Sequence, residues 1–122
     1  MMENWNGFIT NLTQVELLKL ARDDAISDWG EDIKITVLFA SIGRKIAEEF
    51  DEYLPDELVY IFNIIESAMS ASDIGLKTLV ATGLLEALYS KAASDAILWK
   101  RIENQLGEAS RKYLIEWGSW SE

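Results

Sequence analysis

Residues 72–92 constrain the fold more than any other stretch of this chain. Only three charged residues, Asp73, Lys77 and Glu86, occur among the first seventeen residues of the stretch. A helix that is apolar over so much of its circumference is covered on several sides, so we expect a central helix at about residues 73–91. Its apolar residues recur at the helical steps of three and four, namely Ile74, Leu76, Leu79, Val80, Leu84, Leu85 and Leu88.

Small residues within this stretch indicate close helix packing. Glycine inside a helix costs about 1 kcal/mol relative to alanine, so Gly83, with Ala81 beside it, predicts a neighbouring helix that passes close to the backbone. Either Ser72 or Asp73 can act as the N-cap, because a side-chain oxygen there can accept a bond from a free N–H of the first turn.

The remaining periodic stretches predict further helices around this one. Thr13 and Glu16 fit a capping box, Gly30 fits a helix terminator, and Pro55 fits a first helical turn. Residues 35–39 are rich in β-branched side chains, but no second clear strand exists to pair with them. The sequence therefore predicts an all-α single domain over residues 1–122, a compact bundle of about five to seven helices. The expected helices are 13–22 or 13–26, 31–53 as one helix or two, 55–70, 73–91, a helix to residue 106 that is capped by Ser94-Asp95, and a last one starting at 109 or 110.

The composition excludes several classes of chemistry. The 122 residues include no histidine and no cysteine, which excludes Ser–His and Cys–His catalysis and the usual zinc sites. The chain has no glycine-rich phosphate loop, so we expect no cofactor. It has no apolar run of about 18 residues and no signal-peptide pattern, so we expect a cytoplasmic protein that does not span a membrane.

The charge is strongly asymmetric along the chain. The net charge is −10; residues 1–73 contain 15 Asp and Glu against 5 Lys and Arg, whereas residues 74–122 contain 6 of each kind. Phosphates would be repelled by the first part, so we expect no nucleic-acid binding. A basic protein partner is favoured, because opposite potentials speed and orient association.

Two acidic segments without a basic residue inside them are the candidate partner-binding sites. The 48–57 segment also contains Tyr53, and the 23–32 segment contains Trp29; these two aromatic residues are the candidate anchors, because tryptophan and tyrosine are enriched at binding hot spots. The acids of the two segments are Glu48, Glu49, Asp51, Glu52, Asp56 and Glu57, and Asp23, Asp24, Asp28, Glu31 and Asp32.

The 48–57 segment has two other interpretations. If residues 31–53 are helical, Glu48 and Glu52 share a helix face and could bind Mg²⁺ together with Asp56 or Glu57. All-helical nucleotide pyrophosphohydrolases use such glutamate pairs, but their next helix brings a second spaced pair, and here it offers only Glu66. The second interpretation is a solvated helix end with no ligand.

The tryptophans and basic pairs of the C-terminal part have simpler interpretations. Trp99 and Trp117 occur at helical spacing among apolar neighbours and are predicted to lie in the core. The pairs 100–101 and 111–112 are dibasic, yet glutamates lie close to each. They are predicted to lie on a solvated helix face.

Two segments carry a resemblance to a known family: residues 80–88, Val-Ala-Thr-Gly-Leu-Leu-Glu-Ala-Leu, and residues 106–110, Leu-Gly-Glu-Ala-Ser, followed by Trp117. With the acidic break between helices, they resemble small all-helical immunity proteins of bacterial polymorphic toxin systems, including contact-dependent growth inhibition. The resemblance spans roughly residues 55–120. It implies a protein that binds the C-terminal domain of a toxin, often a nuclease, and blocks its active site or substrate surface. It implies no catalytic residue.

We therefore expect a binding protein rather than an enzyme. Its expected partner is a cognate basic toxin domain, bound one-to-one through an acidic face. The alternatives from other classes are a Mg²⁺-dependent carboxylate hydrolase and an acidic adaptor or regulator.

Overall fold

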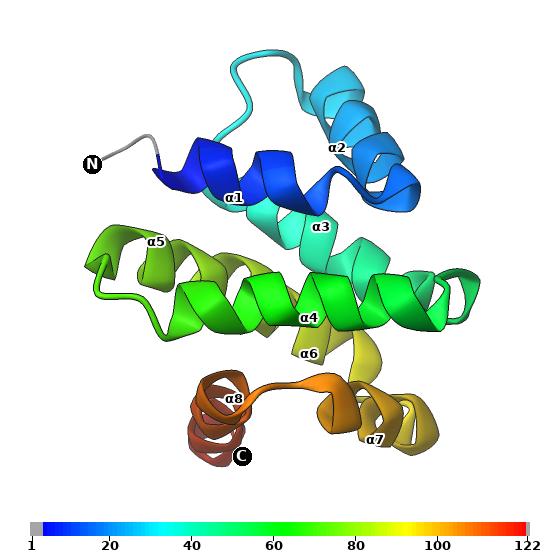
Figure 1. The fold of residues 1–122 in the computed structure, drawn as a ribbon, viewed down its shortest axis with the longest axis vertical. Coiled ribbons are helices and arrows are strands. Elements are labelled where there is room, and N and C mark those ends of the chain that lie inside the picture. The colour runs from blue at the N-terminus through cyan, green and yellow to red at the C-terminus, as the bar shows by residue number, and fades with distance from the viewer. Residues whose placement is uncertain (1–3, 122) are drawn as a thin grey trace.

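The computed structural model describes residues 4–121, and over this range its regular structure is entirely helical (Figure 1). The segments α5, η2 and α6 follow one another without a break and form one long helix, in which η2 is π-helical. The all-α prediction is confirmed, with seven helical rods and one 3-10 turn in the described range. The elements are α1 (Asn4–Leu12), α2 (Glu16–Trp29), α3 (Ile35–Glu48), the 3-10 turn η1 (Phe50–Glu52), α4 (Pro55–Met69), α5 (Ile74–Thr78), η2 (Leu79–Leu85), α6 (Glu86–Ala92), α7 (Ala96–Gln105) and α8 (Glu108–Ser121).

Two helices share the centre of the bundle. The predicted central helix is present as α5–η2–α6, and α3 packs along its η2 and α6 parts while also contacting α2 and η1. Figure 1 shows α1 and α4 in front of this pair, α2 above it, and α7 and α8 below it. The core is continuous through the pair, whose largest fully buried side chains are Phe39, Ile42, Ile46, Leu84, Leu85 and Leu88.

Two glycines let the backbones of the central pair approach each other. A Cβ at Gly43 of α3 would collide with the backbone carbonyl of Leu84, and a Cβ at Gly83 would stand 2.9 Å from the Cβ of Phe39. The prediction of a close helix neighbour at Gly83 is therefore confirmed, and Gly43 supplies the opposite side of the same contact.

Most of the predicted helix ends are confirmed. Leu76 N–H donates to Asp73 Oδ1 at 3.0 Å, and Leu98 N–H donates to Asp95 Oδ1 at 3.0 Å. Gly30 follows the last residue of α2 with a φ of 88°, a left-handed conformation that suits glycine. These signals are local, which explains why the sequence pattern detects them.

Three local predictions were wrong. The Thr13 hydroxyl does not cap α2; it donates to Ile9 O at 2.7 Å, a carbonyl at the end of α1 that also accepts the Thr13 backbone N–H. Residues 31–34 are not helical, and α3 ends at Glu48 instead of reaching residue 53. The first turn of the central helix is not covered, so Ile74 is 70% exposed.

A carboxylate of α4 holds the start of α8. Glu66 accepts hydrogen bonds from Ala109 N–H at 2.8 Å, Ser110 N–H at 3.0 Å and the Ser110 hydroxyl at 2.8 Å. Gly107 makes room for this carboxylate, because a Cβ there would overlap the Glu66 side chain. Desolvation raises the pKa of Glu66, but the hydrogen bonds from Ala109 and Ser110 outweigh it and hold the pKa below its usual value.

Aromatic contacts complete the attachment of α7 and α8. The Tyr89 ring meets Trp99 and Trp117 edge-on, with ring centroids 4.9 and 5.4 Å apart. The Tyr113 hydroxyl donates to Glu86 at 2.5 Å. Both tryptophans are half-buried and pack against the core, so they lie at its margin rather than inside it.

Replacing Gly43 with alanine tests the contact between the central helices. We expect Gly43→Ala to lower the free energy of unfolding by about 1–3 kcal/mol, because the added methyl group meets rigid backbone rather than a movable side chain. Gly7→Ala is the control: no atom lies within 4 Å of that Cβ position, so it should be neutral or stabilising by up to about 1 kcal/mol. Urea unfolding measures both, and equal stability of the two variants would contradict the proposed contact.

Replacing Glu66 with glutamine tests the attachment of α8. The amide keeps the size of the side chain but presents only one acceptor oxygen. We therefore expect Glu66→Gln to lower the free energy of unfolding by about 1 kcal/mol at pH 7, as the loss of an N-cap side chain does. Because the folded pKa is lowered, this stability is present above the unfolded pKa, about 4.3, and is lost as pH falls through the folded pKa. The difference between wild type and variant in the free energy of unfolding, measured in urea, should therefore become smaller as the pH is lowered. Glu108→Gln is the matched control on the exposed first turn of α8.

Candidate functional site

The 48–57 segment does not form the predicted pair of glutamates on one helix. Because α3 ends at Glu48 and η1 begins at Phe50, Glu48 and Glu52 do not share a helix face. Glu48 lies instead between Lys45 at 3.6 Å and Lys91 at 3.4 Å. Among the described residues, no group of three or more potential metal ligands is brought together. The geometric premise of the magnesium interpretation was wrong.

Two arginines of the dibasic pairs have structural contacts. Arg101 pairs with Asp51 at 2.6 Å and lies 5.1 Å from the centre of the Phe50 ring, which links η1 to α7. Arg111 donates to Glu103 O and Leu106 O, both at 3.0 Å, and so satisfies carbonyls at the end of α7. These charges are used within the fold.

Tyr53 lies in the core. Its side chain is 5% exposed, and its hydroxyl has no hydrogen-bond partner within residues 4–121. Burial, together with the nearby carboxylates of Glu49 and Glu57, raises its pKa, so the phenol is neutral at any physiological pH. Of the two candidate anchors, only Trp29 presents its ring to solvent, with 63% exposed.

A pocket between α2 and α3 brings the two acidic segments together at one point. Asp24, Asp28 and Trp29 of the 23–32 segment line it from α2, and Glu48 lines it from α3. Its volume is about 220 Å³, and Arg44 also lies on its wall. Carboxylates beside an exposed indole suit the side chain of a lysine or an arginine.

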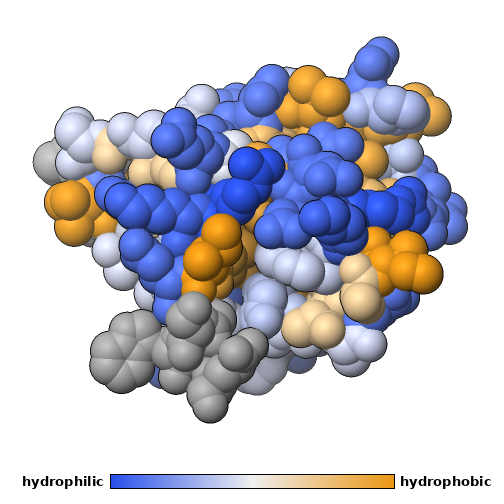
Figure 2. Space-filling view, turned by 90° about the horizontal axis from the view of Figure 1, so that it is seen from below, coloured by the Kyte–Doolittle hydropathy of each residue, from blue (hydrophilic) through white to orange (hydrophobic). Residues whose placement is uncertain are grey.

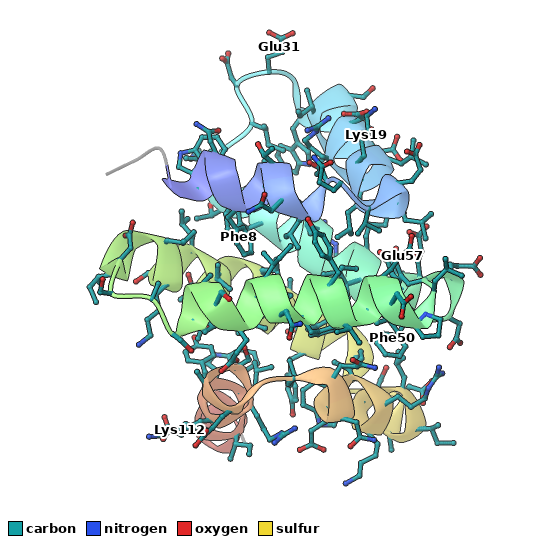
Figure 3. All side chains as sticks on the ribbon, in the orientation of Figure 1. Phe8, Lys19, Glu31, Phe50, Glu57 and Lys112 are labelled. Atoms are coloured by element: carbon teal, nitrogen blue, oxygen red, sulfur yellow. The ribbon has the colours of Figure 1, made fainter. Side chains whose placement is uncertain are left out.

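The other acids are distributed over two separate regions. Figure 3 shows Glu31 on the loop after α2 and Glu57 at the start of α4, well apart. Asp23 pairs with Arg22 at 3.1 Å, and Glu57 accepts the Leu54 N–H at 2.9 Å. Six acids of the two acidic segments are exposed and form no ion pair with any described residue; they are Asp24, Asp28, Glu31, Asp32, Glu52 and Asp56.

A hollow between α1 and α4 was not predicted from the sequence. It is a groove of about 570 Å³ between α1 and α4 that ends at α5, and we refer to it as the α1–α4 groove. Phe8 and Ile64 lie along it, and Tyr60 borders it while donating its hydroxyl hydrogen to Asn11 O at 2.9 Å. The one available signal was the pair of apolar residues Val59 and Tyr60, which the periodicity of α4 places away from the core.

Comparison with known proteins identifies the family. Residues 11–119 match a family described as a domain of unknown function (DUF7674). The chain belongs to this family. No match was found among curated proteins or among solved structures. The matched range includes α2 to α7 and most of α8, with both acidic segments and the α4 side of the groove, whereas most of α1 precedes it.

Within the described part of the chain, no helix is long and apolar enough to cross a membrane. The main features of the described surface are the unpaired acids of the two segments, the exposed Trp29 and the α1–α4 groove.

Tyr53 and Tyr60 provide a matched pair of variants that test the hydrogen bonding of the two hydroxyls. We expect Tyr53→Phe to leave the free energy of unfolding unchanged or to raise it by about 1 kcal/mol, because an unpaired buried hydroxyl is removed. Tyr60→Phe loses the bond to Asn11 O and should lower stability by about 0.5–1.5 kcal/mol. Thermal unfolding compares them, and a larger loss for Tyr53→Phe would show that its hydroxyl is hydrogen-bonded in solution.

Proposed function

We propose that this protein is an immunity protein that binds a basic toxin domain, one-to-one and in the cytoplasm, through its acidic N-terminal half. The toxin domain is of the nuclease type, and binding covers its active site or substrate surface. The observation that carries the proposal is the set of six exposed acids in the 23–32 and 48–57 segments that have no ion-pair partner in the described chain.

Unpaired acids concentrated in one part of a chain are unfavourable for folding, since like charges repel in the compact state. Their presence therefore favours a role other than stabilising the fold, and association with a basic surface is the simplest such role. All six lie in the first 73 residues, which carry the whole net charge of −10. In Figure 1 this part of the chain forms the upper and middle layers of the molecule.

The chemistry of the expected target matches this surface. An enzyme that cleaves RNA or DNA holds phosphates with lysines and arginines. Carboxylates placed over those side chains replace the phosphates and exclude the substrate. The resemblance of residues 80–88 and 106–110 to immunity proteins supports the same conclusion by an independent route.

Neutralising pairs of these acids tests the proposal. The partner is the domain encoded by the gene adjacent to this one, purified separately and brought together with this chain in stopped-flow mixing. We expect Glu52→Gln with Asp56→Asn, and separately Asp24→Asn with Asp28→Asn, to lower the association rate several-fold and to reduce its dependence on salt. The dissociation rate should change less than the association rate, because exposed charges mainly affect the rate of encounter.

The matched control neutralises the same number of acids in the other half of the chain. Glu108→Gln with Glu116→Gln changes the net charge equally, but both residues lie on α8. If this control slows association as much as the two acidic pairs do, only net charge matters and the acidic half is not the interface. If the adjacent domain does not bind wild type, the toxin assignment is wrong.

A further inference from the structure

We propose that the α1–α4 groove binds an apolar side chain from a basic segment of the partner domain, and that this contact sets the lifetime of the complex. The inference rests on the proposed function and adds to it the place and chemistry of the anchor. The groove has a volume of about 570 Å³, within the range of about 300–1,000 Å³ in which proteins enclose ligands.

The walls of the groove suit an apolar side chain. Phe8 is stacked on Phe39 of the core, with ring centroids 5.3 Å apart, and is 5% exposed, so it gives a rigid wall. Tyr60 is held by its bond to Asn11 O. Gly7 opens the α1 side, since no atom lies within 4 Å of the position that a Cβ would occupy. The groove is therefore preformed on rigid helices.

Its polar groups are placed for a peptide backbone. Asn63 and Ser67 follow Tyr60 along the outer face of α4, at helical steps of three and four. Their side chains offer both donors and acceptors to a segment that lies along the groove. None of the residues that line the groove is a lysine, arginine, aspartate or glutamate.

Acidic residues at and just before the start of α4 favour a basic occupant of the groove. Asp56 precedes Tyr60 by four residues and so lies one turn away on the same face of α4. Glu52, exposed and unpaired within the described chain, comes just before α4. A partner segment that places an apolar residue in the groove and a lysine or arginine one helical turn away would contact both the groove and these acids.

The same charges disfavour the other occupants. A second copy would bring another net charge of −10 to this surface, and like charges placed together oppose association. The face formed below by α7 and α8 is mainly hydrophilic, with separate small apolar areas (Figure 2), so the described surface seen there offers no comparable apolar site.

Filling the groove tests the proposal. Gly7→Trp places a large side chain where the wild type has open space, and Asn6→Trp adds the same side chain at an exposed neighbouring position outside the groove. We expect Gly7→Trp to bind the partner domain about tenfold more weakly through faster dissociation, with an unchanged salt dependence of association. Asn6→Trp should bind like wild type. Ser67→Trp fills the groove from α4 and serves if Gly7→Trp does not fold.

A second measurement uses defined probes. A synthetic amphipathic helix of leucine and lysine should shift the amide resonances of Gly7, Asn11, Asn63 and Ser67 in wild type and bind about tenfold more weakly to Gly7→Trp. The same peptide with glutamate in place of lysine should not bind. Equal binding of both peptides would overturn the basic occupant, and a dimer of the chain that Gly7→Trp abolishes would assign the groove to a second copy and overturn the proposal.

The two proposals fail in different ways. If Gly7→Trp keeps full affinity for the partner domain while the acidic pairs reduce its association rate, the groove is not the anchor and the proposed function stands. If wild type does not bind the domain but binds the leucine–lysine peptide in the groove, the toxin assignment fails and the groove remains a site for basic segments.

Discussion

The fold depends on the direct contact between the backbones of α3 and the π-helical part of the central helix. Gly43 and Gly83 remove the side chains that would keep these two helices apart. With the axes so close, Phe39, Ile42 and Leu84 fill the space on either side of the contact and become fully buried. Every other helix packs around this pair, so a change in the distance between the two central helices would alter the packing throughout the core.

The same contact positions the candidate surface. It brings the end of α3 next to α6, where Lys91 reaches Glu48 at 3.4 Å. The chain then turns through η1, fastened to α7 by the pair of Asp51 and Arg101. The 48–57 segment is therefore fastened at two points, Glu48 and Asp51, and its exposed unpaired acids, Glu52 and Asp56, are held on a rigid support. A preformed charged surface loses little conformational entropy on binding.

Charges are used differently in the two parts of the chain. In the C-terminal part they stabilise the fold: Asp95 caps α7, Arg111 satisfies the end of α7, and Glu86 receives the Tyr113 hydroxyl. In the N-terminal part Glu66 and Asp73 have such roles, and Glu48 and Asp51 form ion pairs, but the six exposed acids of the two acidic segments have no such contact. Residues 74–122 contain acid and base in equal number, whereas residues 1–73 contain an excess of acid. This difference favours a partner as the reason for the excess.

Sequence reasoning predicted the features that depend on neighbouring residues. The apolar period identified the central helix, and Asp73, Asp95 and Gly30 marked helix ends because caps act within one turn. It was wrong at Thr13, where two helix ends compete for one hydroxyl and only their spacing decides. The end of α3 at Glu48 was missed for a similar reason, since no strong stop signal occurs there.

Features that depend on distant residues could not be predicted. The bonds from Ala109 and Ser110 to Glu66 join residues more than forty positions apart, and nothing near Glu66 indicates them. The burial of Tyr53 also depends on tertiary packing, as does the α1–α4 groove, whose sides come from separate helices. The candidate acids were found because exposure is the default for carboxylates, whereas the groove required the structure.

Under the proposed function, the acids and the groove would together supply what a tight and specific inhibitor requires. Exposed acids increase the rate of encounter with a basic domain, but they are screened by salt and contribute little to the lifetime of the complex. Apolar burial is insensitive to screening and acts on dissociation, at about 25 cal/mol for each Å² removed from water. Asp56 and Tyr60 lie one turn apart on α4, so the two contributions would act at adjacent points of one interface. A protein with only the acids would bind many basic surfaces weakly, and the groove would provide the selection among them.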